Sequence, residues 1–236
     1  MNEKKFKIKG FAHVTLLDWP GKIAAMIFTP KCNFRCPFCY NKELVLDSKK
    51  LEEIPEEKII KHLTDKKKWL DGLVISGGEP TLWPGLFDFC KKIKDLGFKV
   101  QLQTNGSNPD VLFKLIKSNI VDYIAMDIKG PLLRYPEITK SNIDIQKIKE
   151  SALLVKNSKL DKEFRTTIVP NLIKEKDIEQ IGKDFGGNIS YFIQAFLNQK
   201  TLDKSFENLN PYSKEKFETI KTIAKKYFKR VEMRGV

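Results

Sequence analysis

Three cysteines crowd into eight residues of this chain, with the spacing Cys32-x3-Cys36-x2-Cys39. Thiolates on one short loop can bind three corners of a cubane iron–sulfur cluster, which leaves one iron open to an exogenous ligand. Electron carriers with four cysteines instead close every corner of the cluster. Phe38 stands beside the last cysteine, where an aromatic ring would shield a cluster from water. The spacing therefore favours a cluster with one open position.

A structural zinc site is the main alternative for this loop. Such a site usually has four protein ligands, and the candidates for the fourth are Cys90, His13 and His62. Cys90 lies on the apolar face of a predicted helix and is typical of a buried core thiol. His62 falls in the middle of a helix among lysines, and His13 lies in an extended segment. A zinc or electron-transfer protein without enzymatic activity therefore remains open at this point.

The composition is that of one folded domain, expected over residues 1–236. Of these residues 41% are hydrophobic and 31% charged, so the chain can bury a core and keep a solvated surface. This balance excludes wholesale disorder, fibrous repeats and a collagen-like chain. The sequence shows neither a secretion signal nor an apolar run long enough to cross a membrane. We therefore expect a soluble, cytoplasmic protein with reduced thiols.

The net charge is strongly basic, because 43 Lys and Arg residues outnumber 30 Asp and Glu residues by 13. Nearly all of this excess is lysine. Surfaces that read bases and clamp phosphates favour the planar guanidinium of arginine. A lysine excess spread along helices is typical of a solvated surface, so the charge alone does not indicate a nucleic-acid partner.

Short β-branched or apolar runs alternate along the chain with segments of helical periodicity. Pro55 before two glutamates, and Asn108-Pro109-Asp110, mark helix starts between those runs. This alternation predicts an α/β fold with a parallel sheet, either open and doubly wound or curled into part of a barrel. The expected strands are residues 23–29, 73–76, 98–104, 121–128, 164–169 and 189–196.

Unusual polar residues and glycines lie at or near the end of each expected strand. Ligands of parallel α/β folds bind at the carboxyl ends of the strands, so these residues are candidates for a site. The cysteine loop follows the first strand. The others, in chain order, are Gly77-Gly78-Glu79-Pro80, Thr104 with Asn105, Asp127 with Lys129, Arg165, and Gln194. We expect all of them to gather at one end of the sheet.

The cysteine loop, with an aromatic residue before its last cysteine, and the Gly-Gly-Glu-Pro segment after the next strand together resemble the radical S-adenosylmethionine (SAM) superfamily. The resemblance spans about residues 11–196 and implies the family's partial (βα)6 TIM-like barrel, followed by a C-terminal helical extension over about 198–236. It implies that Cys32, Cys36 and Cys39 ligate a 4Fe–4S cluster whose open iron chelates SAM. The segment implied to receive the methionyl amine of SAM is Gly77, Gly78, Glu79 and Pro80.

A narrower resemblance links Asp127 with Lys129, and Arg165-x-x-Ile-Val-Pro170, to the glycyl-radical-enzyme activating enzymes. In those enzymes such residues line the SAM site, and we expect Thr104, Asn105 and Gln194 to complete it. The alternative for Asp127 and Lys129 is a salt-bridged strand edge.

The flanks of the cysteine loop, residues 17–21 and 41–45, resemble those of the anaerobic ribonucleoside-triphosphate reductase activating proteins. Three departures accompany that resemblance. Lys31 stands where glycine is usual and Tyr40 where histidine is usual. Gln194 and Phe196 stand near the place where pyruvate formate-lyase activators carry a histidine.

The resemblance implies an oxidoreductase that reductively cleaves SAM to a 5′-deoxyadenosyl radical. It further implies that the radical takes a hydrogen atom from a glycine of anaerobic ribonucleotide reductase, with flavodoxin or ferredoxin as electron donor. Neither a membrane nor a nucleic acid is an expected partner. The alternative within the superfamily is an enzyme that modifies a small molecule, a peptide or tRNA.

Overall fold

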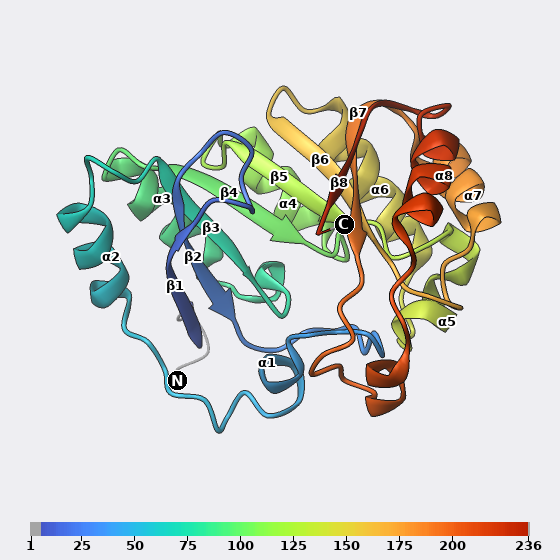
Figure 1. Cartoon of the computed structure of the whole chain (residues 1–236). Coiled ribbons are helices and arrows are strands. Elements are labelled where there is room, and N and C mark those ends of the chain that lie inside the picture. The colour runs from blue at the N-terminus through green and yellow to red at the C-terminus, as the bar shows by residue number, and fades with distance from the viewer. Residues whose placement is uncertain (1–5, 236) are drawn as a thin grey trace. The chain divides into compact units, whose positions relative to one another are not determined.

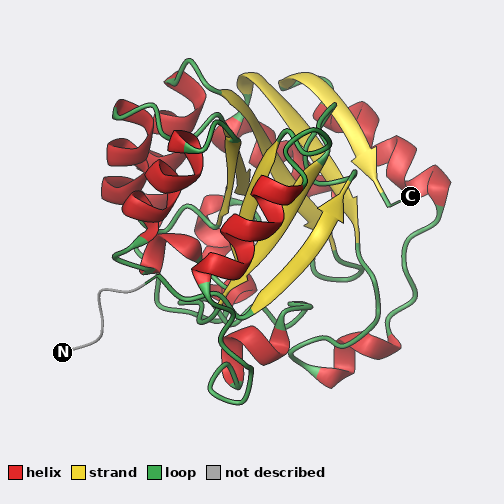
Figure 2. Ribbon diagram, turned by 90° about the vertical axis from the view of Figure 1, so that its left-hand side faces the viewer, coloured by secondary structure: helices red, strands yellow, loops and turns green. Residues whose placement is uncertain are grey.

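The computed structural model describes residues 6–235 of the chain. Strands and helices alternate along most of its length (Figures 1 and 2). Within the described residues, no helix is long and apolar enough to span a membrane. The strands are β1 (Gly10–Thr15), β2 (Ala24–Thr29), β3 (Gly72–Gly77), β4 (Lys99–Thr104), β5 (Tyr123–Asp127), β6 (Asp161–Ile168), β7 (Gly187–Ala195) and β8 (Phe228–Arg234). The α-helices are α1 (Lys42–Leu46), α2 (Glu56–Asp65), α3 (Leu86–Asp95), α4 (Pro109–Lys117), α5 (Tyr135–Thr139), α6 (Ile145–Asn157), α7 (Glu175–Phe185) and α8 (Lys214–Ala224), and the 3₁₀ helices are η1 (Pro80–Leu82), η2 (Leu132–Arg134) and η3 (Lys204–Asn208).

The strands are hydrogen-bonded in the order of the chain, from β1 to β8. β1 pairs with β2 in the antiparallel sense, whereas β2, β3 and β4 are parallel to one another, as are β6, β7 and β8. The six strands expected from the sequence correspond to β2 through β7. The predicted α/β class with a parallel sheet is therefore confirmed, and β1 and β8 extend it at the two ends of the strand order.

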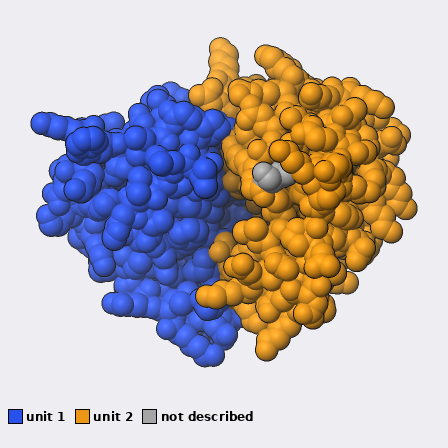
Figure 3. All heavy atoms as spheres, in the orientation of Figure 1, with its two compact units in different colours: residues 1–32, 43–104, 110–124 blue, residues 33–42, 105–109, 125–236 orange. Residues whose placement is uncertain are grey.

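The chain divides into two compact units (Figure 3). Unit 1 contains residues 1–32, 43–104 and 110–124, and unit 2 contains residues 33–42, 105–109 and 125–236. The boundary falls inside β5, between Ile124 and Ala125. The prediction of a single domain stays a prediction.

The core of unit 1 forms around β2 and β3. Their sequences AAMIFT and GLVISG are nearly continuous apolar runs, which is typical of parallel strands that are covered on both faces. Ile27 and Val74 are fully buried. On α3, Phe89 and Ile93 recur at helical spacing and are buried as well, and the ring of Phe6 stacks on Phe89 with 4.7 Å between centroids.

The core of unit 2 lies between the strands β6 and β7 and the helices that follow them. Phe164 of β6 meets Phe185 of α7 edge-on, with ring centroids 6.3 Å apart. Tyr191 of β7 is buried and stacks on Phe228 of β8 at 4.2 Å. β8 thus belongs to the packed part of unit 2, although the sequence predicted only a helical extension there.

Candidate cofactor site

The three clustered cysteines lie on the loop that follows β2. Cys36 is buried, and Cys32 and Cys39 are half-buried. The N–H of Cys39 donates to the carbonyl oxygen of Cys36 in a tight turn (3.1 Å). Cys32 belongs to unit 1 and the other two to unit 2. Among residues 6–235, no three His, Cys, Asp or Glu side chains are already arranged around a common metal position, so the ligand role of the cysteines stays a prediction.

Lys31, directly before the first cysteine, has a φ of 63°. This left-handed conformation costs a residue with a side chain about 1 kcal/mol relative to glycine. A glycine, which the resemblance leads one to expect here, would adopt this backbone without that cost. The Lys31 ammonium lies 5.6 Å from the ring centroid of Trp83, close enough for a cation–π contact.

Aromatic rings anchor the second half of the cysteine loop within unit 2. Phe34 meets Tyr135 edge-on at 6.5 Å, and the N–H of Arg35 donates to the carbonyl oxygen of Thr139 (2.8 Å). Phe38 is 5% exposed, as the predicted shielding role requires. The loop is therefore held to α5 by both apolar and hydrogen-bonding contacts.

Tyr40, the second departure from the family pattern, ties the loop to the end of β7. Its hydroxyl oxygen accepts a hydrogen bond from the N–H of Leu197 (2.5 Å), and its ring stacks on Phe196 at 6.1 Å. Burial raises the pKa of the Tyr40 phenol, although the Leu197 N–H opposes that shift. Tyr40 therefore stays neutral and fixes the backbone next to Cys39.

Three of the predicted site residues form a charged cluster at the ends of β5 and β6. Asp127 accepts from Arg165 Nε at 2.8 Å and from Lys129 Nζ at 3.0 Å. Burial alone would raise the pKa of Asp127, but Arg165 and Lys129 outweigh it and hold the pKa below its usual value. Burial alone would lower the pKa of Lys129, but Asp127, Cys36 and Cys39 outweigh it and raise that pKa. The cluster thus places a persistent cation near two of the cysteines.

The same cation acts on the thiol of Cys39. Burial raises the pKa of Cys39, while the N–H of Asn41 and the Lys129 ammonium oppose that rise. A hydrogen-bond donor and a positive charge next to a thiol favour its thiolate, which is the form that binds metals. Burial outweighs both, so the pKa of Cys39 is above its usual value, and the Asn41 N–H and Lys129 are the two features that would favour a metal-bound thiolate.

In unit 1 the Gly-Gly-Glu-Pro segment is fixed by backbone contacts. The N–H of Gly78 donates to the carbonyl oxygen of Thr29, and the N–H of Glu79 donates to that of Lys31, both at 2.8 Å. Gly77 has a φ of 123°, which favours glycine. A Cβ on Gly78 would overlap the carbonyl oxygen of Lys31. Both glycines are therefore required by the close approach of the loops after β2 and β3.

The carboxylate of Glu79 is buried and joins three elements of unit 1. Its Oε1 accepts from the hydroxyls of Thr81 (2.6 Å) and Thr104 (2.7 Å) and from the N–H of Thr81 (3.1 Å). Pro80 follows at the first position of η1. The structure therefore brings Gly77, Gly78, Glu79, Pro80 and Thr104 together, as the sequence predicted for their strand ends.

Asn105 and Gln194 lie in unit 2. Asn105 donates to Asn33 Oδ1 (2.9 Å) and accepts from the N–H of Ser107 (2.9 Å). The hydroxyl of Ser107 is buried and has no hydrogen-bond partner within residues 6–235, so it is available to a ligand. Gln194 is half-buried on β7, in register with Thr167 of β6.

The sequence did not predict three contacts of these residues. Thr81 binds Glu79, Asn33 binds Asn105, and the hydroxyl of buried Tyr135 accepts from the N–H of Lys129 (3.1 Å). Thr81 and Asn33 adjoin predicted motifs, so adjacency was a usable signal for both. Tyr135 lies six residues from Lys129, and no local pattern marks it.

The three candidates for a fourth metal ligand make other contacts in unit 1. Cys90 is fully buried on α3 among apolar side chains, and burial raises its pKa to about 12. His13 and His62 stack on each other at 5.0 Å, next to Phe11. His62 Nε2 lies 3.0 Å from the carbonyl oxygen of His13. Cys90 is therefore a core thiol, as predicted.

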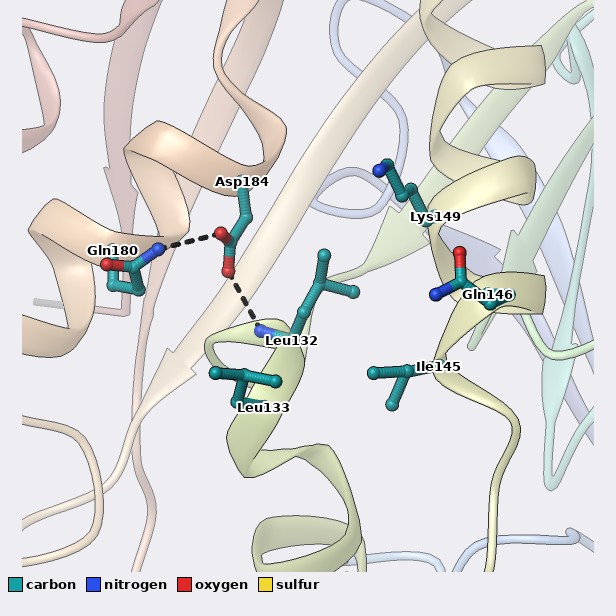
Figure 4. Close-up of a pocket in the computed structure, with 7 residues that line it drawn as sticks. All are labelled: Leu132, Leu133, Ile145, Gln146, Lys149, Gln180 and Asp184. Atoms are coloured by element: carbon teal, nitrogen blue, oxygen red, sulfur yellow. Dashed lines mark hydrogen bonds between the residues drawn. The ribbon is translucent and has the colours of Figure 1, made fainter.

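A separate cavity of about 280 Å³ opens in unit 2 (Figure 4). Asp184 closes one side of it by accepting from Gln180 Nε2 (2.8 Å) and from the N–H of Leu132 (2.9 Å). The lining contains none of the predicted site residues: Leu132, Leu133, Ile145, Gln146, Lys149, Gln180 and Asp184. The predicted cofactor residues therefore form a different feature of the molecule.

Comparison with known proteins agrees with this fold and cysteine loop. The family model of the Radical SAM superfamily matches residues 26–185. A protein of Methanocaldococcus jannaschii with the provisional name of glycyl-radical enzyme activating enzyme is 35% identical over 98% of this chain and 97% of its own length. A second such protein of that organism is 30% identical over 93% of this chain and 82% of its own length. The structure of Streptococcus suis SuiB bound to S-adenosylmethionine is 14% identical, with a TM-score of 0.59 over 89% of this chain and 52% of that one.

A parallel α/β sheet with a three-cysteine loop after its first parallel strand defines the class of protein. The chain belongs to the radical SAM superfamily, and it is related to the glycyl-radical enzyme activating enzymes. The family's cofactors are SAM and an iron–sulfur cluster. The residues here fit that pair, since three reduced thiols share one loop, Lys129 lies near two of them, and Ser107 offers a buried hydroxyl.

Proposed function

We propose that this chain is an oxidoreductase of the activating type, a single domain with its core over residues 11–196. Its substrate in this proposal is a glycine of anaerobic ribonucleotide reductase. The Methanocaldococcus jannaschii relative that is 35% identical over 98% of this chain supports the activating type. The structural observation that chiefly supports the proposal is the position of Lys129. Lys129 is held by Asp127 at 3.0 Å and lies close enough to Cys36 and Cys39 to be influenced by both.

In this proposal Cys32, Cys36 and Cys39 hold a 4Fe–4S cluster. A reduced cluster held there would supply the electron for reductive cleavage of SAM, and the expected products would be methionine and the 5′-deoxyadenosyl radical that would take a hydrogen atom from glycine. The Lys129 ammonium offsets part of the negative charge that three thiolates bring to the loop. Phe38 limits the access of water to it.

SAM carries an amino group, a carboxylate, a sulfonium, a ribose and an adenine, and the proposed residues match these groups by type. Gly77 and Gly78 expose backbone without side chains, and Glu79 with Pro80 and Thr104 fixes that segment. Lys129 and Arg165 are cations suited to the carboxylate. Asn105 and Gln194 offer amide groups to the ribose and the adenine, and Asp127 orients both cations.

The surface also suits an acidic electron donor of the flavodoxin or ferredoxin kind. The chain carries a formal net charge of +13. Opposite charge accelerates the encounter of two proteins more than it tightens their complex. Reduction by such a donor should therefore slow as the salt concentration rises.

The test is anaerobic reconstitution with iron and sulfide, followed by dithionite reduction and addition of SAM. The expected product is 5′-deoxyadenosine, and a Cys36→Ala variant should form none. Cys90→Ala is the matched control, because that thiol is buried in the core of unit 1. Addition of anaerobic ribonucleotide reductase should then give a glycyl-radical signal in electron paramagnetic resonance. A reductase that stays without a radical, while 5′-deoxyadenosine forms, would refute the proposed substrate.

A further inference from the structure

One face of the strands β6, β7 and β8 in unit 2 is charged. Phe164 and Tyr191 are paired in register and belong to the face that packs against α7, since Phe164 contacts Phe185. Side chains alternate along a strand, so the neighbours of these residues point to the opposite face. The register places two rows there, Arg165 with Phe192 and Glu232, and Thr167 with Gln194 and Arg234.

Arg234 of β8 is held on this face by two contacts. Its Nη1 and Nη2 donate to the two carboxylate oxygens of Glu163 at 2.7 and 2.8 Å. The centre of its guanidinium lies 3.7 Å from the ring centroid of Phe192. Glu163 is fully buried, whereas the Arg234 side chain is 19% exposed. The guanidinium is therefore oriented rigidly and still reaches the surface of this face.

This arrangement leaves Arg234 suited to a neutral acceptor. A guanidinium has five N–H groups, and the hydrogen bonds of Arg234 within residues 6–235 use two of them. Glu163 already neutralises its charge, so a second carboxylate would gain little from it. The remaining donors match the carbonyl oxygens of a peptide backbone.

β8 also lies where an extended segment can approach. It is the last strand in the order and has β7 as its sheet neighbour within the described residues (Figure 1). The free edge of such a strand is a common place for extended peptides to bind. Phe192, whose ring the Arg234 guanidinium contacts, is in register with Arg165 of β6, which the cofactor cluster contains.

We propose that Arg234, positioned by Glu163 and Phe192, binds a backbone carbonyl of the glycine-containing segment of the substrate protein. This inference rests on the proposed function and adds to it a substrate-binding residue on β8. Phe192 then links the two parts of the site, since it is in register with Arg165 and its ring contacts Arg234.

The probe is the capped peptide acetyl-Ala-Gly-Ala-amide with deuterium on the glycine α-carbon. Transfer of deuterium into 5′-deoxyadenosine is measured with reconstituted full-length protein over a range of peptide concentrations. Arg234→Met alone would remove the cation that pairs with the buried carboxylate of Glu163, so the main variant is the neutral pair Glu163→Gln/Arg234→Met. Arg234→Lys, which keeps the charge opposite Glu163 and removes the planar fork, is the second variant. Arg230→Met is the matched control, since Arg230 lies on the same strand with a side chain 66% exposed.

The expected result for both Arg234 variants is a KM for the peptide about tenfold higher, with kcat changed less than about threefold, as for the loss of one ligand hydrogen bond. Arg230→Met should match the wild type. An unchanged KM in variants that keep a cooperative thermal transition would overturn the role of Arg234. Failure of the wild-type protein to transfer deuterium from glycine would overturn the proposed function itself, and the two failures are therefore distinguishable.

Discussion

The predicted site residues are fixed by different interactions in the two units. At the end of β3 in unit 1, the contacts are made by the backbone of Gly78 and Glu79 with the loop after β2. At the end of β5 in unit 2, they are made by the charges of Asp127, Lys129 and Arg165. A backbone site responds to added volume, whereas a charged site responds to the loss of a partner. Substitutions at the two sites should therefore destabilise the protein for different reasons: steric overlap in unit 1 and the loss of an ion pair in unit 2.

The largest effect should come from adding one methyl group to the backbone site. In Gly78→Ala the new Cβ would overlap the carbonyl oxygen of Lys31, a backbone atom that cannot turn aside. We expect the free energy of unfolding to fall by about 3 kcal/mol, as for an overpacked core. SAM affinity of the reconstituted protein should fall by at least about tenfold, because a displaced backbone donor costs about that much.

Gly21→Ala is the control for this change. Gly21 has a φ of 69°, but no atom lies within 4 Å of a Cβ placed there. It should lose about 1 kcal/mol from backbone conformation alone, with SAM affinity unchanged. Calorimetric unfolding and a SAM titration measure both quantities. Equal losses in the two variants would show that the close approach to Lys31 is not what fixes the site.

The charged site should be most sensitive at Asp127. Asp127→Asn keeps the size of the side chain and leaves Lys129 and buried Arg165 without their carboxylate. Removal of one partner from a largely buried ion pair costs about 3 kcal/mol. Asp95→Asn, which breaks the exposed pair with Lys91, should be indistinguishable from the wild type in urea unfolding. A similar null result for Asp127→Asn would mean that solvent screens the cluster.

The same variant gives a pH dependence with a definite sign. Arg165 and Lys129 outweigh burial and hold the pKa of Asp127 below its usual 3.8. A carboxylate with a lowered folded pKa stabilises the fold above the unfolded pKa, and that contribution is lost as pH falls through the folded value. The stability gap between wild type and Asp127→Asn should therefore be constant near neutral pH and shrink below about pH 4. If the difference in stability between wild type and Asp127→Asn grew as the pH fell, the pKa of Asp127 would be raised rather than lowered.

The contrast between the units also explains what the sequence could predict. Residues 73–76 are largely apolar and residues 164–169 are rich in β-branched side chains; the first run lies in β3 and nearly all of the second in β6. β1 (GFAHVT) and β8 (FKRVEMR) carry histidine or charges in place of a continuous run, so periodicity did not predict them. Such strands stand at the ends of the strand order, where one edge has no strand neighbour within residues 6–235 and burial is partial.

The site shows the same division. Positions at strand ends were predictable because topology places them, and Asp127, Lys129 and Arg165 are indeed in contact. The structure contains the salt bridge that was the alternative for Asp127 and Lys129, and the same bridge orients Lys129 near Cys36 and Cys39. Contacts such as that of Tyr135 with Lys129 depend on how a helix packs, which a local motif does not encode.

A smaller loss of stability is expected at Tyr40 in unit 2, where a hydrogen bond and a stacked ring both hold the cysteine loop. Tyr40→Phe removes the oxygen that accepts from the N–H of Leu197 but keeps the ring that stacks on Phe196. We expect a loss of about 1 kcal/mol in unfolding free energy, because Leu197 is largely exposed and water can replace the phenol. Tyr40→Leu, which also removes the stacked ring, should lose more. If the two variants lose equally, the hydrogen bond rather than the ring positions the loop.

The smallest functional effect should be at the fourth cysteine. Cys90 is fully buried in unit 1, and burial raises its pKa to about 12, so almost none of it is thiolate at pH 8. In the native protein without its cluster, the half-buried Cys32 should therefore react with iodoacetamide, while Cys90 reacts only after unfolding. Cys90→Ala should bind as much iron and sulfide per chain as the wild type, whereas each variant of the other three cysteines should bind less. Loss of iron in Cys90→Ala would instead identify this core thiol as a fourth metal ligand. A centre with four protein ligands would contradict the proposed chemistry, because SAM needs one open position on the cluster.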